Sequence, residues 1–518
     1  MKKIRLLWAD DEIDLLRAHV LFLEEKGYEV VTATNGNEAI QLVKSSVFDL
    51  VFLDEHMPGI GGLETLEIIK DISPALPVVM ITKNEAEEIM DEAIGSRITD
   101  FLIKPVHPKQ ILLTIKKCMD QKRLVSEKTT SGYQSQFGEI SRLINMAAGF
   151  GDWKEIYRRL VYWELELEKH GDTGMREVLR TQKYEANRSF GKYITASYPS
   201  WFEKDPPEKP LLSPGVFKQV VVPRLQNHEK ILFILIDNLR LDQWKAMAPI
   251  FAEHLNIASE DLYCSILPTC THYARNALFS GLMPLEIMKH HPDLWKFEDE
   301  PGSKNIHEGE LLKRQLTRLG MNIPFRYEKV GNLDEGHKLV EQWQDMKAFP
   351  LNVVVYNFVD MVSHARTEVE MIKELAADEP AFRSLSLSWF RHSSLLDLIR
   401  EISSEKFTLI LTTDHGSIRV NNPIKVVGDR ESSTNLRYKT GKNLNYNPRE
   451  VFEVFDPEKI HLPKTQLTSR FIFARNDNFM VFPKNFNYYA GFFRNTFQHG
   501  GISLEEMMAP LVVLTPRS

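Results

Sequence analysis

Cysteine is scarce in this sequence, which argues against a disulfide-stabilised secreted fold. Only Cys118, Cys264 and Cys270 occur among 518 residues, too few for a disulfide framework and in keeping with a reducing compartment. Long apolar runs are scarce too. The first one stops at Asp10, which is too short for a signal peptide, and no segment approaches the roughly 20 apolar residues of a membrane span. We therefore expect a soluble cytoplasmic protein without membrane insertion.

Positive charge is not in excess either. Lysine and arginine number 64 against 71 acidic residues, giving a net charge of −7, so the chain lacks a general basic footprint for nucleic acid, although a local patch could still bind one. We find no helix-turn-helix with a basic recognition helix, and a DNA-binding regulator is therefore unsupported. The length predicts roughly two to four domains.

The first 120 residues contain five short apolar segments separated by helical patterns. The segments are Ile4–Ala9, Tyr28–Ala33, Leu50–Leu53, Pro77–Ile81 and Asp100–Ile103. Strands that alternate with helices predict a doubly wound, flavodoxin-like parallel sheet.

Polar residues follow four of these strands. Asp10 and Asp11 follow the first, Asp54 the third, Thr82 the fourth and Lys104 the fifth, and the carboxyl ends of parallel strands meet at one edge. Three carboxylates there repel one another unless a cation such as Mg²⁺ lies among them. Asp54 can then accept a phosphoryl group, which Lys104 and Thr82 can bind. The alternative is that these residues are ordinary polar strand ends.

Residues 1–120 resemble a response-regulator receiver domain along their whole length. The resemblance implies that Asp54 is the phosphoacceptor and that a sensor histidine kinase is its donor. It also implies that Asp10, Asp11 and Asp54 hold Mg²⁺. Three further roles are implied: Lys104, before a cis Pro105, pairs with the phosphate, and Thr82 and Phe101 form the switch pair.

Residues 121–205 show no strand pattern. Gln121–Gln136 predicts either a linker or a solvated extension of a helix, and the segment after it predicts about three helices separated by turns at Gly149–Asp152 and Gly171–Gly174. The charged stretch Glu164–Lys169 is typical of a solvated helix face. Prolines between Pro199 and Pro214 mark the next boundary. We expect a helical bundle that transmits a signal between the two ends of the chain.

Metal-binding residue types follow the apolar segments of residues 206–518. Asp237 follows the buried strand 230–236, and Asp414 and His415 follow the expected parallel strand that begins at Thr408. Asp360 and His364 follow the strand that starts at Leu351, at a spacing that puts both on one face of a helical turn. The last candidate, His499, precedes a pair of glycines.

Thr271 opens a predicted helix that extends to Phe279. A hydroxyl at a helix N-terminus lies in positive potential, which favours an alkoxide or a phosphate. Locally, the ordinary role of a helix N-cap is the more frequent one. Arg240 and Arg275 could bind phosphate, although salt bridges are expected more often.

Together these residues supply three carboxylates, three imidazoles and one hydroxyl. Any single histidine would more often be structural, but the combination suits two zinc ions with nitrogen and oxygen ligands. Two adjacent metal ions can activate a nucleophile and hold a leaving group. The full set is Asp237, Thr271, Asp360, His364, Asp414, His415 and His499.

Residues from about 215 to 518 resemble a PglZ domain, an α/β branch of the alkaline phosphatase superfamily. Its marks are the Pro-Thr-x-Thr run at 268–271, Asp414-His415-Gly416 and the late His499-Gly500-Gly501. The resemblance makes Thr271 the nucleophile of a phosphodiesterase, through a covalent phosphothreonine. A sulfatase fits poorly because Cys270 lacks the Cys-x-Pro-x-Arg frame. The resemblance implies two zinc sites: Asp237, Thr271, Asp414 and His415 in one, and Asp360, His364 and His499 in the other.

The whole α/β multidomain chain resembles the PorX type of response regulator, with a receiver at 1–120, a helical connector at 121–205 and a PglZ domain at 206–518. The resemblance implies dimerisation on phosphorylation, a link to type IX secretion, and contact with a sigma factor or a secretion component. We expect a phosphorylation-controlled zinc phosphodiesterase acting on nucleotides or oligonucleotides. The alternative is a non-enzymatic signalling scaffold whose PglZ domain binds such a partner.

Overall fold

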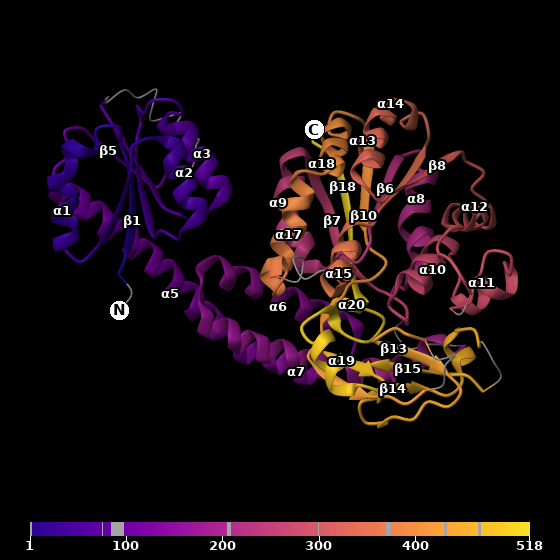
Figure 1. Cartoon of the computed structure of the whole chain (residues 1–518). Helices are drawn as coiled ribbons and strands as arrows, with labels where there is room; N and C mark the ends of the chain where they lie inside the picture. Colours follow the sequence, from indigo (N-terminus) through magenta and orange to yellow (C-terminus); the bar gives the residue numbers. More distant parts are fainter. Residues whose placement is uncertain are drawn as a thin grey trace. The chain divides into compact units, whose positions relative to one another are not determined.

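The computed structural model describes residues 3–74, 76–83, 98–204, 209–298, 300–368, 374–428, 433–464 and 468–517, with backbone alone at 120–127 and 366–368. The chain forms two compact units. The first contains Met1–Gln134 and Lys169–Asp172, and the second contains Ser135–Glu168 and Thr173–Ser518 (Figure 1). The domain boundary expected at residue 206 lies outside the described residues.

The first unit contains a parallel sheet of five strands in the order β2-β1-β3-β4-β5. The strands are β1 (Arg5–Ala9), β2 (Glu29–Ala33), β3 (Leu50–Asp54), β4 (Val78–Thr82) and β5 (Asp100–Ile103). The central strands β3 and β4 are buried throughout, as expected for strands covered on both faces. This order is that of the flavodoxin-like fold, so the fold class predicted from the sequence is confirmed.

Helices cover both faces of this sheet (Figure 1). One apolar cluster contains Ile40 from α2 and Leu66 from α3. The other contains Leu23 from α1 together with Ile111 from α5. The bounds are α1 (Arg17–Glu25), α2 (Gly36–Ser45), α3 (Gly62–Ile72) and α5 (Pro108–Met146), with a short helix, η1, at Ile13–Leu16.

The connector consists of three helices, as the sequence predicts. Residues 121–136 lie within α5, so they extend a helix and do not form a flexible linker. The other two helices are α6 (Phe150–His170) and α7 (Thr173–Ser197). The break before α7 lies at the expected Gly171–Gly174 turn, whereas α6 already begins at Phe150, so most of the turn expected at Gly149–Asp152 is helical. Trp153 packs against Phe190 with ring centres 5.4 Å apart, and this contact joins α6 to α7.

The charged stretch of α6 is not a solvated face, and the expectation from its sequence is wrong. Glu164 accepts from Lys183 of α7 at 2.6 Å and from the buried Arg383 of α17 at 3.3 Å. Glu168 also pairs with Arg383. These carboxylates neutralise arginine and lysine groups packed between the connector and the rest of the second unit, which pattern alone cannot reveal.

The main sheet of the second unit has the strand order β7-β18-β10-β6-β9-β8. The expected strand from Thr408 is β10, which is parallel to β6 but antiparallel to β18, so the predicted parallel pairing holds on one side only. The bounds are β6 (Lys230–Ile236), β7 (Leu255–Cys264), β8 (Phe325–Val330), β9 (Leu351–Tyr356), β10 (Phe407–Thr412) and β18 (Met508–Pro516).

Helices lie on both sides of this sheet in Figure 1. They are α8 (Val222–Gln226), α9 (Leu241–His254), α10 (Asn276–Ser280), α11 (Pro284–His290), α12 (Glu308–Arg318), α13 (Leu333–Glu341), α14 (Trp343–Met346), α15 (Phe358–Glu368), α17 (Glu379–Arg391), α18 (Ser394–Ile402) and α20 (Leu504–Met507). Short helical turns lie at Pro199–Phe202, Ser213–Gly215, Phe217–Val221, Thr271–Arg275 and Pro457–Ile460.

A smaller β-rich region lies apart from the main sheet, in the lower part of Figure 1. Its own apolar core includes Ile424, Ile472 and Met480. The strands are β11 (Ile418–Arg419), β12 (Asn422–Lys425), β13 (Tyr438–Gly441), β14 (Val451–Val454), β15 (Arg470–Ala474), β16 (Asn478–Val481) and β17 (Phe497–Gln498), with α19 (Phe486–Phe493) between the last two.

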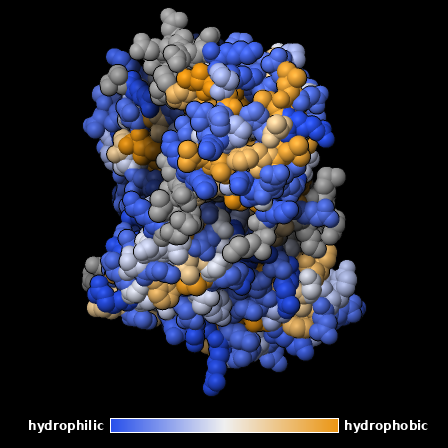
Figure 2. Space-filling view, turned by 90° about the vertical axis from the view of Figure 1, so that its left-hand side faces the viewer, coloured by the Kyte–Doolittle hydropathy of each residue, from blue (hydrophilic) through white to orange (hydrophobic). Residues whose placement is uncertain are grey.

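Hydrophilic residues cover most of the face drawn in Figure 2, and hydrophobic residues form separate patches between them. Among the helices that the structure describes, none has both the length and the apolar character of a membrane span.

Candidate functional sites

The carboxyl edge of the first sheet brings the predicted receiver residues together. Asp10, Asp11 and Asp54 each offer a carboxylate oxygen, and these atoms lie within 4.8 Å of one another. The Lys104 Nζ atom lies 3.0 Å from Asp10 Oδ2 and 2.8 Å from Asp54 Oδ1. Thr82, at the end of β4, donates a hydrogen bond to Glu55.

The electrostatics of this edge suit a bound cation. Burial raises the pKa of Asp54, and the charges of Asp10 and Asp11 raise it further, against the lowering effect of Lys104. Three carboxylates and one ammonium group leave surplus negative charge, and oxygen donors are those that Mg²⁺ takes. The Lys104–Pro105 peptide bond is cis, and Phe101 is half-buried on β5.

The second unit gathers the other candidate residues where strands of its main sheet end. Asp237 follows β6, and Asp414 and His415 follow β10. Ligand sites of open α/β sheets lie at such strand ends. Asp360 and His364 project from α15, one turn apart, and His499 follows β17.

Asp237, Asp414 and His415 form a first, fully buried group of donors. The His415 Nε2 atom lies 3.7 Å from Asp237 Oδ1 and 3.8 Å from Asp414 Oδ2. The other ring nitrogen, Nδ1, lies 3.1 Å from the carbonyl oxygen of Gly416. A carbonyl only accepts, so Nδ1 donates to it and Nε2 faces the two carboxylates. A cation among these three donors would be bound by all of them, and such a backbone contact commonly orients metal-binding histidines.

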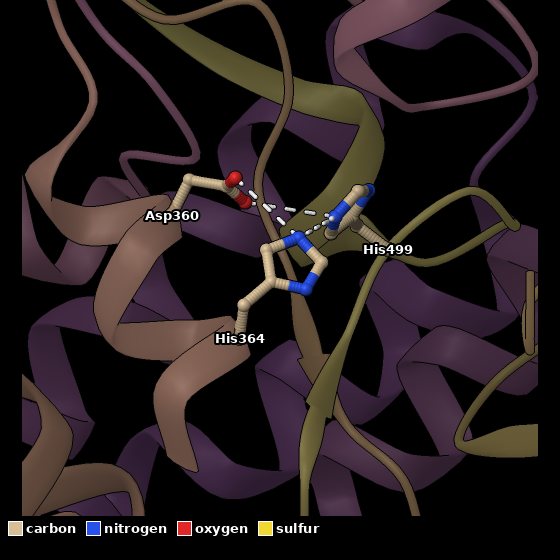
Figure 3. A group of neighbouring side chains, drawn as sticks. All are labelled: Asp360, His364 and His499. Carbon is tan, nitrogen blue, oxygen red and sulfur yellow. Dashed lines mark hydrogen bonds and ion pairs between the residues drawn. The ribbon is translucent and has the colours of Figure 1, made fainter. Parts of the chain in front are cut away.

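Asp360, His364 and His499 form a second group (Figure 3). The His364 Nε2 atom lies 3.4 Å from Asp360 Oδ2, and the His499 Nε2 atom lies 3.6 Å from Asp360 Oδ1. The two imidazole Nε2 atoms are 3.5 Å apart. Three donors therefore converge on one point, as in a metal site with an open position.

Thr271 lies beside the first group. Its Oγ1 atom is 3.4 Å from Asp237 Oδ1 and 3.1 Å from His415 Nε2. Cys270 occupies the N-cap position, and Thr271 begins a π-helical turn that leads into α10. The N-cap interpretation of Thr271 is therefore wrong, and the predicted helix over 271–279 begins with this different turn. The side chain is directed at the metal donors instead of its own backbone.

Two contacts join the donor groups. The rings of His415 and His499 stack with centres 4.4 Å apart. Asn238 donates from Nδ2 to Asp360 Oδ1 at 3.2 Å. Asn238 was not predicted from the sequence. Its φ of 64° puts it in the left-handed region, which asparagine tolerates better than most residues, and an asparagine directly after a strand-end aspartate is the signal that could have identified it.

Arg275 and Arg240 both form buried salt bridges, as the sequence predicts. Arg275 pairs with Asp237, and its Nε atom lies 2.9 Å from Asp414 Oδ2. Arg240 pairs with Asp242 at 2.6 Å and with Glu379. Arg275 thus holds two donors of the first group in place, while Arg240 belongs to the ion network that meets the connector.

One arginine does not neutralise the acids of this centre. Burial raises the pKa of Asp237 well above its ordinary value, and the negative charges of Asp414 and Asp360 raise it further. The positive charge of Arg275 lowers this pKa but does not cancel the increase. Burial alone would also raise the pKa of Asp414, but Arg275 and His415 hold it below its usual range. Imidazole nitrogens and carboxylate oxygens are the donors zinc takes in catalytic sites, so the residues of both groups fit zinc.

Three family models match successive parts of the chain. Residues 6–116 match the response regulator receiver domain, residues 123–202 match the PorX response regulator linker domain, and residues 216–514 match the BREX system PglZ alkaline phosphatase-like domain.

Several curated proteins and solved structures are similar to about a quarter of the chain. The transcriptional regulatory protein ZraR of Klebsiella oxytoca is 33% identical over 139 residues, 27% of this chain and 31% of that protein. The alginate biosynthesis transcriptional regulatory protein AlgB of Pseudomonas aeruginosa is 34% identical over 125 residues, 24% and 28% of the two chains. The chain thus spans about a third of the length of these relatives. A CheY-like receiver domain protein from Methanospirillum hungatei is 28% identical, covering 23% of this chain and 96% of its own, with a TM-score of 0.23.

The PglZ model covers more than half of the chain, and the other two models cover most of the remainder. Alkaline-phosphatase-like and receiver domains usually bind metal ions, in agreement with the donor groups at the ends of the strands described above. The chain therefore belongs to the PglZ alkaline-phosphatase-like family, as a response regulator of the PorX type with a receiver domain, a linker domain and a PglZ domain.

Proposed function

We propose that this response regulator is a zinc-dependent phosphodiesterase acting on nucleotides or oligonucleotides, controlled by phosphorylation of Asp54. The observation that carries the proposal is the place of the Thr271 hydroxyl. Its Oγ1 atom lies 3.1 Å from His415 Nε2, in the first donor group. The ring of His415 stacks on that of His499, which belongs to the second donor group. A purely structural domain does not require a hydroxyl at such a point.

The donor groups divide between two zinc ions in this proposal. One ion is held by Asp237, Thr271, Asp414 and His415, and the other by Asp360, His364 and His499. When bound, zinc supplies positive charge that polarises phosphoryl oxygens and stabilises developing negative charge.

The chain's own groups act as follows. Thr271 Oγ1 gives its proton to water and attacks phosphorus, and its bond to phosphorus forms as the bond to the leaving alkoxide breaks; the alkoxide takes up a proton from water. A water molecule then attacks the same phosphorus, returns a proton to the threonine oxygen and releases the phosphomonoester. Arg275 keeps Asp237 and Asp414 in position through its salt bridges. Asn238 orients Asp360 through the amide hydrogen bond to Oδ1.

Control begins in the receiver, for which a sensor histidine kinase is the phosphate donor. Asp10, Asp11 and Asp54 would hold Mg²⁺, which would supply positive charge for the phosphoryl oxygens. Asp54 accepts the phosphoryl group, Lys104 pairs with the phosphate, and Thr82 and Phe101 change position in response. The chain then dimerises. We assign the receiver to residues 1–120, the connector to 121–205 and the PglZ domain to 206–518.

The protein acts in the cytoplasm in this proposal, since its buried cysteines are free thiols and suit a reducing compartment. A link to type IX secretion, and contact with a sigma factor or a secretion component, would make it part of a regulatory pathway. The competing function is a scaffold that binds such a partner without catalysis. The donor groups and Thr271 favour the enzyme, because a scaffold does not require a nucleophile beside metal ligands.

The test compares hydrolysis of bis(p-nitrophenyl) phosphate and p-nitrophenyl phosphate by the zinc-loaded protein. Wild type should cleave the diester, and Thr271→Val should lose about a thousandfold or more of that rate while it retains about two zinc ions per chain. Thr271→Ser, which keeps a hydroxyl, should retain turnover. If the zinc-loaded, phosphorylated wild type cleaves neither ester, the enzyme proposal is wrong and the scaffold takes its place.

A further inference from the structure

Helix α19 exposes an aromatic face, defined here by Tyr488, Tyr489 and Phe492. Tyr488 is 66%, Tyr489 40% and Phe492 38% exposed. Residues four apart on this helix lie with nearly parallel rings: the planes of Tyr488 and Phe492 differ by 16°, and those of Tyr489 and Phe493 by 17°. Large aromatic side chains are normally buried, and a cluster on the surface indicates an interaction site.

The sequence segment that contains this face has no acidic residues, unlike the chain as a whole. No aspartate or glutamate occurs between Asp477 and Glu505, although the protein carries a net charge of −7. The exposed cations Lys484 and Arg494 flank the helix in sequence. A third cation, Lys425 of β12, has its Nζ atom 5.6 Å from the ring centre of Phe486. Flat rings bordered by positive charge fit a ligand that is both planar and anionic.

The aromatic face is close to the candidate zinc site along the chain. Arg494 precedes His499 by five residues, so their Cα atoms are at most roughly 18 Å apart. Between them, β17 pairs with β11, which follows His415 closely in sequence. The Ser363 hydroxyl of α15 donates to the carbonyl of Phe497 at 3.2 Å. These contacts place β17, the strand that follows α19, beside α15, which carries Asp360 and His364, and beside β11, which follows the segment with Asp414 and His415.

We infer that the aromatic face of α19 binds unpaired bases of a single-stranded nucleic acid while one of its phosphodiesters lies at Thr271. This inference rests on the proposed phosphodiesterase function and specifies its substrate class. Single-strand-binding proteins combine aromatic rings on which bases stack with cations that follow the backbone, and both are present here. A duplex keeps its bases stacked within itself and should bind weakly.

The test measures binding and cleavage of a fluorescein-labelled single strand of about 12 thymidines, a length within the range of single-strand-binding sites. Tyr488→Ser combined with Phe492→Ser removes one ring from each end of the face. The matched control is Phe455→Ser, an aromatic residue of the same β-rich region that is 71% exposed. Fluorescence anisotropy gives the dissociation constant whether or not the protein is active. Thermal melting of each variant establishes that it is folded.

The expected result is at least about a tenfold weaker single-strand affinity for the double variant, since each base–aromatic stack contributes a factor of roughly 5 or more. Its kcat/KM for the single strand should fall by a similar factor relative to its kcat/KM for bis(p-nitrophenyl) phosphate. Phe455→Ser should bind and cleave like wild type. Strand affinity unchanged in the double variant overturns the inference, even if wild type cleaves the small diester.

Failure of the proposed function has a different signature, in which wild type cleaves neither substrate but anisotropy still reports on the aromatic face. Two other outcomes also overturn the inference. If the double variant changes the dimerisation of the protein and not its affinity for the strand, the face contacts a second copy of the chain. If it abolishes binding to anionic phospholipid vesicles and leaves strand affinity intact, the face meets a membrane surface.

Discussion

Lys439 is a buried lysine whose titration should change the stability of the PglZ domain. Its side chain is 1% exposed, and its Nζ atom donates to the carbonyl of Ser433 at 2.8 Å. The same atom lies 4.5 Å from the ring centre of Phe482. Burial lowers the pKa of Lys439 from 10.5 to about 7, against the opposing charge of Glu298.

The direction of the effect follows from proton binding. Between about pH 7 and 10.5 the unfolded chain keeps the lysine proton while the folded chain releases it, so stability rises with pH across this window. Burial of the charged form opposes folding most strongly below about pH 7, and this penalty shrinks steadily as the pH rises from the folded pKa of about 7 to the unfolded value of 10.5. From pH 6 to pH 9 the free energy of unfolding should gain roughly 3 kcal/mol through this residue.

Urea unfolding of wild type and Lys439→Met at pH 6 and pH 9 measures this contribution. The variant should gain stability relative to wild type at pH 6, and this advantage should shrink by roughly 3 kcal/mol at pH 9. Lys442→Met, which removes an exposed lysine nearby, should show the pH dependence of wild type. If Lys439→Met shows that dependence as well, the amine is not held in its neutral form by burial and the reasoning is refuted.

Three other predictions follow from the same structure. Asp242 bonds to Arg240 at 2.9 Å and pairs with Arg383. Asp242→Asn removes this shared carboxylate, although Arg240 keeps Glu379 and Arg383 keeps Glu164 and Glu168. The free energy of unfolding should fall by about 1–3 kcal/mol in urea titrations, and a smaller loss would show that the remaining acids compensate both cations. Wild type treated with acetyl phosphate and Mg²⁺ should elute as a dimer from a sizing column and Asp54→Ala as a monomer, whereas equal masses would exclude switching through Asp54. Dialysis against a chelator should lower the Tm of the zinc-loaded protein, and added zinc should restore it. If free zinc is at 100 times its Kd, its removal takes about 2.7 kcal/mol from the free energy of unfolding. An unchanged Tm would count against both zinc sites.

Receiver features could be predicted from the sequence because their signals are local. Each buried strand of the first sheet is a short aliphatic run, and Asp54, Thr82 and Lys104 stand at or directly after the ends of such runs. The carboxyl ends of parallel strands share one edge, so sequence order alone predicts that these side chains meet. The 2.8 Å contact between Lys104 and Asp54 agrees with this expectation.

The position of the Thr271 side chain could not be predicted from the neighbouring sequence. Its partners are Asp237, 34 residues before it, and His415, 144 residues after it. The nearby sequence resembles an ordinary helix start, and only the packing of α10 against the main sheet turns the hydroxyl toward those side chains. The role of Asn238 likewise depends on Asp360, 122 residues away.

The β-rich region and the charged face of α6 were missed for a related reason. Strands β11 and β17 have two residues each, too few to show alternation. Glu164 and Glu168 look like solvated charges until Arg383, more than 200 residues later, is packed against them. Pairing partners at such separations leave no periodic pattern in the sequence.

The most direct test of the account is to detect the covalent bond that it requires. The zinc-loaded protein would be mixed with bis(p-nitrophenyl) phosphate, quenched in acid within the first turnover and digested for mass spectrometry. The account predicts a p-nitrophenyl phosphoryl group on the peptide that contains Thr271, and none on that peptide from Thr271→Val. Diester turnover by wild type without any modified threonine, or turnover preserved in Thr271→Val, would contradict the claim that Thr271 is the nucleophile.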